Sequence, residues 1–293
     1  MKTFRLIGMA LLAAMLCTNF TACSSSDEPE ELQKNDEGLV TNQKKLSEIS
    51  NPDGSTREFI YDDEGKLIMA THSDGSTYSY TWNTNTIVEN TQLWQETFNI
   101  ENNLITTTKE VWGTNVRSER TFSYDANGLL QNIKYKDSDS YPIKWEDGKI
   151  IQIENAQFSY SGKTCKGYLP ILIWHIDESC LLFEAHPELI GMRTNQLPDG
   201  YSYTDNYTSE YYDEVIGETC QIQYIDECTT KYTYTWDNDG YLESCTSTET
   251  DTRTQKYSFK DLNGDGVITN DERDVEEYIT TQTYTDTYTF KWE

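Results

Sequence analysis

A short pattern recurs along this chain and limits what the chain can fold into. Two aromatic residues separated by one residue are followed by an acidic turn with glycine and then by an aliphatic residue, at 59–67, 122–130, 145–150 and 234–242. Residues two apart in a strand lie on one face, so the aromatic rings share a side. Glycine suits the positive-φ positions of tight hairpin turns. The pattern therefore predicts consecutive β-hairpins.

The copies are irregularly spaced, which argues against a solenoid or propeller of fixed period. Tyrosine is abundant, with 21 residues, and threonine recurs throughout, so the composition favours strands. We predict an all-β fold for a single domain at 46–293. Its architecture is an antiparallel meander of hairpins that forms a curled sheet or a water-soluble barrel.

Three predicted strands carry a longer aromatic ladder, at 78–82, 232–236 and 288–292. Serine, threonine or lysine lies between the rings, as at Ser79 and Thr81, so one face is aromatic and the other is polar. Aromatic faces can stack on sugars, but they far more often form the core of a sheet, and we predict a core here. A strand of a membrane barrel needs an apolar outer band that faces lipid, and the polar face of these strands does not provide one.

The segment 168–198 interrupts the hairpin pattern and is the most apolar part of the domain. We predict a short helical or irregular insert here that plugs or caps the sheet. A second short helical stretch is allowed for over 272–280.

The N-terminus has the features of an export signal. A positively charged start precedes the apolar run 6–16, and Thr21 and Ala22 stand directly before Cys23. The run is too short to be a spanning helix. Cys23 in this setting resembles the lipobox of bacterial lipoproteins. The resemblance implies that a signal peptide, 1–22, is removed and that Cys23 is acylated and anchors the chain in the membrane. The alternative is ordinary secretion with a chance cysteine.

Residues 23–45 are polar, acidic and contain proline, so they predict a flexible tether behind the anchor. The run Asp27–Glu31 is similar to the acidic export tag of surface lipoproteins in the Bacteroides group. The resemblance implies an outer-membrane, lipid-anchored protein exposed at the cell surface. The alternative is an anchored protein that faces the periplasm.

The formal net charge is −27. So acidic a surface repels phosphate backbones and anionic headgroups, which argues against a nucleic-acid partner. Contact with the membrane is then expected through the lipid anchor, and the remaining partner classes are glycans and proteins.

Five cysteines remain once the signal is cleaved and Cys23 is acylated: Cys165, Cys180, Cys220, Cys228 and Cys245. An odd number leaves at least one thiol unpaired, and the pairing of the others is open. Cys220 and Cys228 have the strand parity of Ile222 and Tyr224, which favours buried thiols.

The hairpins resemble the YD repeats of Rhs-type shells, which are much longer. Together with the lipobox and the stretch 186–198, they make the chain more similar to small Bacteroides-group lipoproteins of unknown function with a porin-like β fold. The resemblance covers roughly residues 45–293. It implies a fold and no activity.

Residues 261–272 match the D-x-N-x-D-G-x-I-x-x-x-E calcium loop of EF-hands at each position. The preceding residues are typical of a strand, so we predict a lone loop with a structural Ca²⁺ rather than a paired helical sensor. The alternative is a solvated acidic turn. The predicted ligands are Asp261, Asn263, Asp265, Val267 through its carbonyl, Thr269 and Glu272.

Catalytic signatures are scarce. The chain has neither G-x-S-x-G nor H-E-x-x-H, and His72, His175 and His186 show no ligand spacing, so structural roles are expected for them. With 50 acidic residues, a glycosidase-like pair cannot be recognised from sequence. We predict an envelope lipoprotein with a binding or structural role and an unknown ligand. A non-enzymatic role is favoured over catalysis. The alternative is a carboxylate-dependent hydrolase acting on surface glycans.

Overall fold

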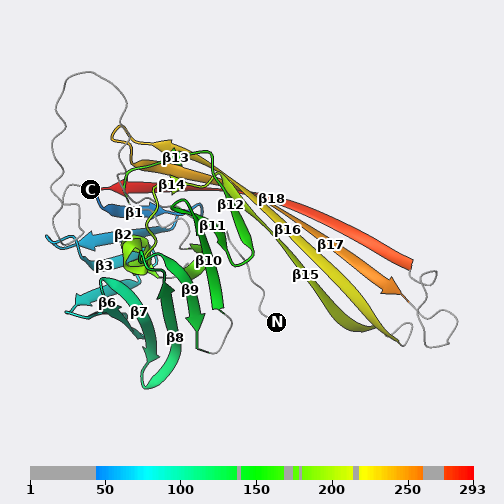
Figure 1. The fold of residues 1–293 in the computed structure, drawn as a ribbon, viewed down its shortest axis with the longest axis horizontal. Helices are drawn as coiled ribbons and strands as arrows, with labels where there is room; N and C mark the ends of the chain where they lie inside the picture. The colour runs from blue at the N-terminus through cyan, green and yellow to red at the C-terminus, as the bar shows by residue number, and fades with distance from the viewer. Residues whose placement is uncertain (1–43, 137–139, 168–173, 178–179, 214–217, 260–273) are drawn as a thin grey trace.

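The computed structural model describes residues 44–136, 140–167, 174–177, 180–213, 218–259 and 274–293. Within these ranges sixteen strands form a closed antiparallel barrel, in which β18 returns to pair with β1 (Figure 1). The all-β prediction is confirmed, and the sheet is closed rather than only curled.

The first part of the barrel is a meander of short strands, each paired with the next. These are β1 (Leu46–Ser50), β2 (Thr56–Tyr61), β3 (Leu67–His72), β4 (Thr77–Trp82), β5 (Thr86–Asn90), β6 (Gln95–Glu101), β7 (Leu104–Trp112), β8 (Asn115–Tyr124), β9 (Leu130–Tyr135), β10 (Ser140–Glu146), β11 (Lys149–Ile153) and β12 (Ala156–Ser159).

The second part consists of long strands: β15 (Gly200–Asp213), β16 (Glu218–Trp236), β17 (Leu242–Phe259) and β18 (Asp274–Trp292). The separate pair β13 (Lys163–Thr164) and β14 (Gln196–Leu197) lies outside the barrel sheet. The short helix allowed for over 272–280 is wrong, because β18 already begins at Asp274 and its alternation continues the β17 ladder.

The recurrent motif forms hairpin turns by the mechanism that its residues suggest. Oδ1 of Asp62 accepts hydrogen bonds from the backbone N–H groups of Glu64 and Lys66, at 3.0 and 2.9 Å. Asp125 binds two N–H groups of its own turn in the same way. Gly65 has a φ of 78°, which glycine adopts without a steric penalty. The acid and the glycine of the motif therefore stabilise each turn.

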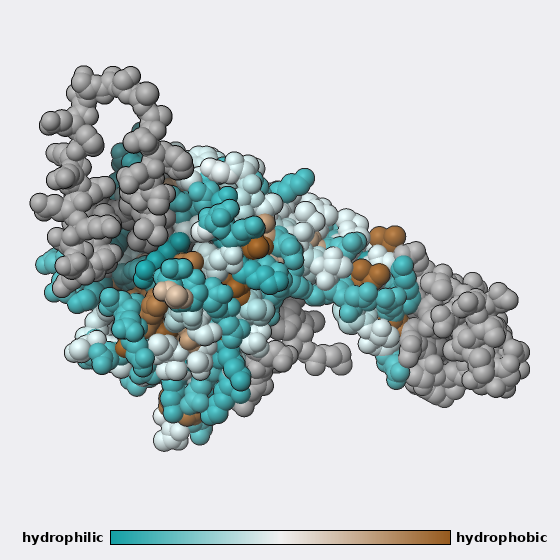
Figure 2. All heavy atoms as spheres, in the orientation of Figure 1, coloured by the Kyte–Doolittle hydropathy of each residue, from teal (hydrophilic) through white to brown (hydrophobic). Residues whose placement is uncertain are grey.

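The aromatic ladders form the core, as predicted. Tyr80, Tyr232 and Tyr288 are all buried in the barrel. The side chains on the opposite face of β4, such as Ser79 and Thr81, are exposed. In the view of Figure 2 the barrel surface is mostly polar, with scattered hydrophobic residues.

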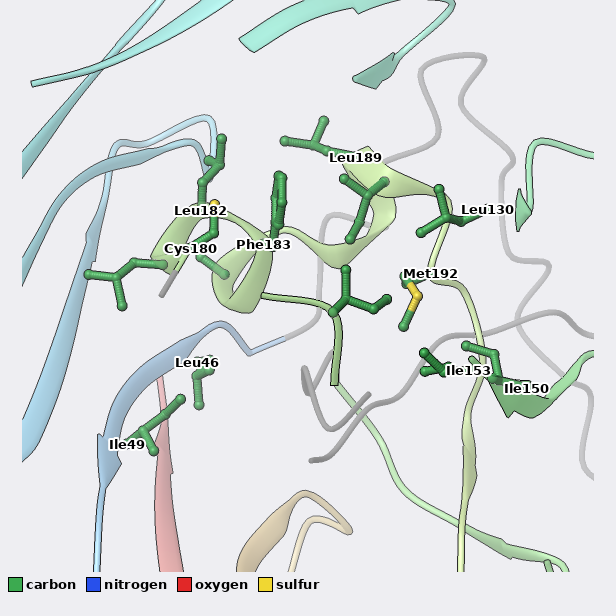
Figure 3. Close-up of a cluster of buried hydrophobic side chains, with 14 of the residues drawn as sticks. Leu46, Ile49, Leu130, Ile150, Ile153, Cys180, Leu182, Phe183, Leu189 and Met192 are labelled. Atoms are coloured by element: carbon green, nitrogen blue, oxygen red, sulfur yellow. The ribbon is translucent and has the colours of Figure 1, made fainter. Parts of the chain in front are cut away.

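The insert after β13 fills the barrel, which confirms the predicted plug. It contains α1 (Trp174–Asp177), α2 (Leu181–Ala185) and the 3-10 helix η1 (Pro187–Ile190). The Phe183 ring is fully buried and meets Phe98 and Phe122 edge-on, with centroids 5.9 and 5.8 Å away. Figure 3 shows the apolar side chains of this plug among those of the barrel wall.

Among the described residues, two buried arginine–carboxylate pairs accompany this apolar core. Arg57 of β2 pairs with Glu184 of the plug, whose side chain is fully buried. Arg120 of β8 donates from Nη2 to Glu96 at 2.6 Å and from Nε to the Thr108 hydroxyl at 2.9 Å. Polar side chains thus connect the plug to the wall, and β8 to β7 and β6.

The long strands extend beyond the barrel. β12 pairs only with Gly200–Ser202 of β15, and β1 pairs with β18 only from Thr289 onward. Past these contacts the four strands pair with one another and project as a sheet (Figure 1). We call residues 203–213, 218–228, 251–259 and 274–282 the arm. Among the described residues, no helix is long and apolar enough to cross a membrane.

Candidate functional site on the arm

The arm is a sheet with two distinct faces. Its inner face continues the barrel interior and carries the odd residues of β15 and β17 and the even residues of β16 and β18. The cross-strand row Tyr203, Cys228, Asp251 and Gln282 lies on this face. The outer face carries the alternate residues.

The outer face is rich in threonine. On the arm, the hydroxyls of Thr252 in β17 and Thr281 in β18 lie 3.3 Å apart, and the same row of pairs continues onto the barrel wall with Thr246 and Thr287 at 2.9 Å. Cross-strand threonine pairs of this kind stabilise a sheet modestly, and β-branched residues suit its pleated surface. The frequent threonines of β17 and β18 are therefore explained by cross-strand pairing in this sheet.

The inner face exposes aromatic rings beside charged side chains. Tyr207 and Tyr224 stack, with centroids 4.9 Å apart and planes 13° from parallel. Arg253 donates two hydrogen bonds to Asp226, at 2.6 and 2.7 Å, and its guanidinium lies 6.0 Å from the centre of the Tyr224 ring. The Asp226 hydrogen bond raises the pKa of Arg253 above its ordinary value. The result is an ordered surface of rings, carboxylate and guanidinium.

Much of this aromatic surface is open to solvent. Tyr207 is 45% exposed, Tyr278 is 54% exposed and Tyr284, at the base of the arm, is 49% exposed. These tyrosines lie outside the three aromatic ladders, and sequence reasoning did not single them out. The sequence does contain a signal for them. The alternating runs 218–236 and 274–292 contain no glycine and are longer than a strand that only crosses the barrel wall.

The predicted site residues do not fall in the described part of the chain. Cys23 lies outside it, and so does the whole of 261–272, with Asp261, Asn263, Asp265, Val267, Thr269 and Glu272. The strands that the predicted calcium loop joins are described, however, and their ladder runs as far as the pair Phe259 and Asp274. This pair lies at the end of the arm away from the barrel (Figure 1).

The three histidines are structural in their contacts, as expected. His175 is buried against Phe158 and Tyr201, and burial lowers its pKa to about 4. In the plug, Nε2 of His186 accepts a hydrogen bond from the backbone N–H of Leu67 at 3.2 Å. His72 packs beside Tyr78.

Two buried carboxylates of the barrel are held by ion pairs. Glu96 and Glu184, buried in the barrel, pair with Arg120 and Arg57. Within the described residues, the chain brings together one group of three side chains of metal-ligating type, Cys228, Glu249 and Asp251, at the base of the arm.

Comparison with known proteins supports the fold. No protein-family model matches the chain, and no curated protein matches it. Among solved structures, the chain is similar to a porin-like protein from Bacteroides uniformis ATCC 8492. The TM-score is 0.53 at 18% identity, over 87% of this chain and 98% of that one. A likeness at this identity shows the barrel fold alone.

A second solved structure, TcdB2-TccC3-TEV, aligns with a TM-score of 0.20 at 10% identity, over 72% of this chain and 17% of that one. That score is too low to support an argument. The predicted porin-like β fold is therefore confirmed through the first neighbour, while the lipobox, the YD-like repeats and the calcium loop stay predictions.

Proposed function

We propose that the chain is a lipid-anchored envelope protein that binds neutral glycans on the inner face of its arm and catalyses no reaction. The observation that carries the proposal is the aromatic and charged surface held outside a barrel whose own interior is filled by the plug. Exposed aromatic surface beyond what a core needs is typical of a binding site.

The chemistry of the inner face suits sugars. The C–H face of a pyranose ring packs against an aromatic ring, while its hydroxyls bind planar polar groups such as carboxylate and guanidinium. Tyr207 offers the ring, and Asp226 and Arg253 offer the polar groups beside it. The net charge of −27 disfavours anionic polysaccharides, so a neutral glycan fits best.

The geometry also fits display from a membrane anchor at Cys23. Lys45, at the start of the domain, exchanges backbone hydrogen bonds with Glu293 at 2.5 and 2.9 Å. Glu293, marked C in Figure 1, lies on the side of the barrel remote from the tip of the arm. A tether that joins the domain at Lys45 therefore leaves the arm pointing away from the anchored end.

Cells that express the full chain test both parts of the proposal. We expect wild type to incorporate a clickable fatty acid and to bind at least one member of a panel of fluorescent neutral glycans. Cys23→Ala should lose the fatty-acid label. Tyr207→Ala combined with Tyr224→Ala should keep the label and bind about 10-fold more weakly, because aromatic anchors carry much of the binding energy.

The matched control is Trp112→Ala, which removes a 37% exposed ring from the barrel and should leave glycan binding unchanged. Equal labelling of wild type and Cys23→Ala would refute the anchor. Binding of no glycan by correctly labelled wild type, or undiminished binding by the double variant, would refute the role of the arm.

The proposal includes one structural Ca²⁺ in the loop 261–272. Calcium prefers six to eight oxygens, which the six predicted ligand positions supply. We expect isothermal titration to show one site, and calcium to raise the melting temperature by linkage. Asp261→Ala and Glu272→Ala should abolish most of that rise. Asp63→Ala, in another acidic hairpin turn, should not. Absence of binding at ~1 mM calcium, the weak end for extracellular modules, would contradict the site.

A further inference from the structure

Three side chains of metal-ligating type meet on the inner face where the arm leaves the barrel. Cys228 of β16 and Asp251 of β17 are directly opposed in the ladder. Glu249 lies two residues from Asp251, opposite Thr230, so all three side chains project to the same side. The Cys228 sulfur and one oxygen from each carboxylate lie within 4.8 Å of one another.

The cysteine of the group is buried, the two carboxylates are partly buried, and neighbours already orient Glu249. Cys228 is 2% exposed. Oε2 of Glu249 accepts hydrogen bonds from the Tyr201 hydroxyl at 3.0 Å and from the Thr230 hydroxyl at 3.2 Å. Hydrogen bonds of this kind to a carboxylate fix its direction, as they do around metal ligands.

The group places two carboxylates next to a thiol. Among the described residues, the structure shows no lysine or arginine in an ion pair with Glu249 or Asp251. A divalent cation would compensate three acidic groups held this closely.

A fourth polar group independently points to a missing ligand. The Tyr232 side chain is 2% exposed, and its hydroxyl has no hydrogen-bond partner among the described residues. Tyr232 follows Cys228 and Thr230 on the inner face of β16, and its ring packs against Tyr201, 6.2 Å between centroids. Buried hydroxyls normally have a partner, and water bound to an ion at the neighbouring group would be a partner of the right kind.

We propose that Cys228, Glu249 and Asp251 bind one Zn²⁺ at the base of the arm. A thiolate selects a soft or borderline ion and excludes calcium, whose ligands are oxygens. Zinc takes sulfur and carboxylate ligands in a tetrahedral shell, which leaves one position for water. The thiol loses its proton to the solvent on binding. The ion ties β16 to β17 where β15 and β18 lose their barrel partners.

Cobalt substitution tests the site, because a thiolate bound to Co²⁺ gives a charge-transfer absorption in the near ultraviolet. The full chain is titrated with Co²⁺ and then with Zn²⁺, with calcium present to occupy the loop 261–272. We expect one Co²⁺ per chain, a charge-transfer band, and displacement by Zn²⁺. Cys228→Ser should abolish the band, and Glu249→Gln and Asp251→Asn should each weaken zinc binding by about 10-fold or more.

Two variants serve as matched controls. Cys165→Ser removes a half-buried thiol elsewhere, and Glu227→Gln removes an exposed carboxylate from the outer face of β16 next to Cys228. Both should keep the band and the affinity. A wild type without the band, or a folded Cys228→Ser that retains it, would overturn the site. If Cys228→Ser fails to fold, X-ray absorption of the zinc-loaded wild type shows whether a sulfur atom is bound to the zinc. One sulfur at ~2.3 Å supports the site and none refutes it.

Discussion

Replacing Arg120 with methionine is expected to lower the free energy of unfolding by about 3–5 kcal/mol. The guanidinium is 8% exposed and bonds Glu96, whose side chain is 7% exposed. Glu89 is 2% exposed and stands directly opposite Glu96 in the ladder between β5 and β6. Methionine has a similar length but no charge, so it leaves two buried carboxylates without this cation. Denaturant titration followed by circular dichroism measures the change.

Arg117→Met is the matched control, since it removes the same charge from the same strand. Arg117 is 59% exposed and lies 3.8 Å from Glu110, a surface ion pair that contributes little. We expect a loss of about 1 kcal/mol or less for this variant. If Arg120→Met destabilised the barrel no more than Arg117→Met does, the buried pair would not contribute to stability as its geometry indicates.

Local features of the fold could be predicted because they depend on residues close in sequence. The turn acids bind N–H groups two and four residues on, as at Asp62 and Asp125. Strand parity alone places Tyr80 inside and Ser79 outside. The apolar character of 168–198 was enough to indicate a plug, because a closed sheet must bury something in its interior.

Features set by distant contacts could not be predicted. Arg57 and Glu184 are 127 residues apart, and only the docked plug brings them together. Barrel closure depends on β1 meeting β18, and the arm exists because β1 and β12 are shorter than the strands they adjoin. The alternating pattern identifies a strand but not where its neighbours end.

The metal-ligating group at the base of the arm could not be predicted for the same reason. Cys228 was expected to be buried from its parity, and it is. Its position opposite Asp251 is fixed by the register between β16 and β17, and a shift of one residue would place Asp251 on the other face. Register follows from the bulge and turn that join these strands, where Trp236 pairs with Leu242. The metal-ligating group is thus a property of the assembled ladder.

Replacing Gly191 with alanine is expected to lower the free energy of unfolding by about 2–5 kcal/mol. Gly191 ends the 3-10 helix of the plug with a φ of 67°, where a side chain costs about 1–2 kcal/mol. An added Cβ would also lie 2.2 Å from the backbone oxygen of Gly128 and 3.0 Å from the backbone nitrogen of Leu130. These are backbone atoms of the β8–β9 hairpin, so relief requires the plug to move away from the wall.

Gly75→Ala isolates the backbone strain in this effect, because Gly75 has a φ of 90° but nothing within 4 Å of an added Cβ. It should cost about 1–2 kcal/mol from backbone strain alone. The difference between the two variants in denaturant titration therefore measures the tight contact between plug and wall. Equal losses would show that the plug can shift without cost at Gly191. A larger loss at Gly191, with faster exchange of the plug amides, is the result that a closely packed interior requires.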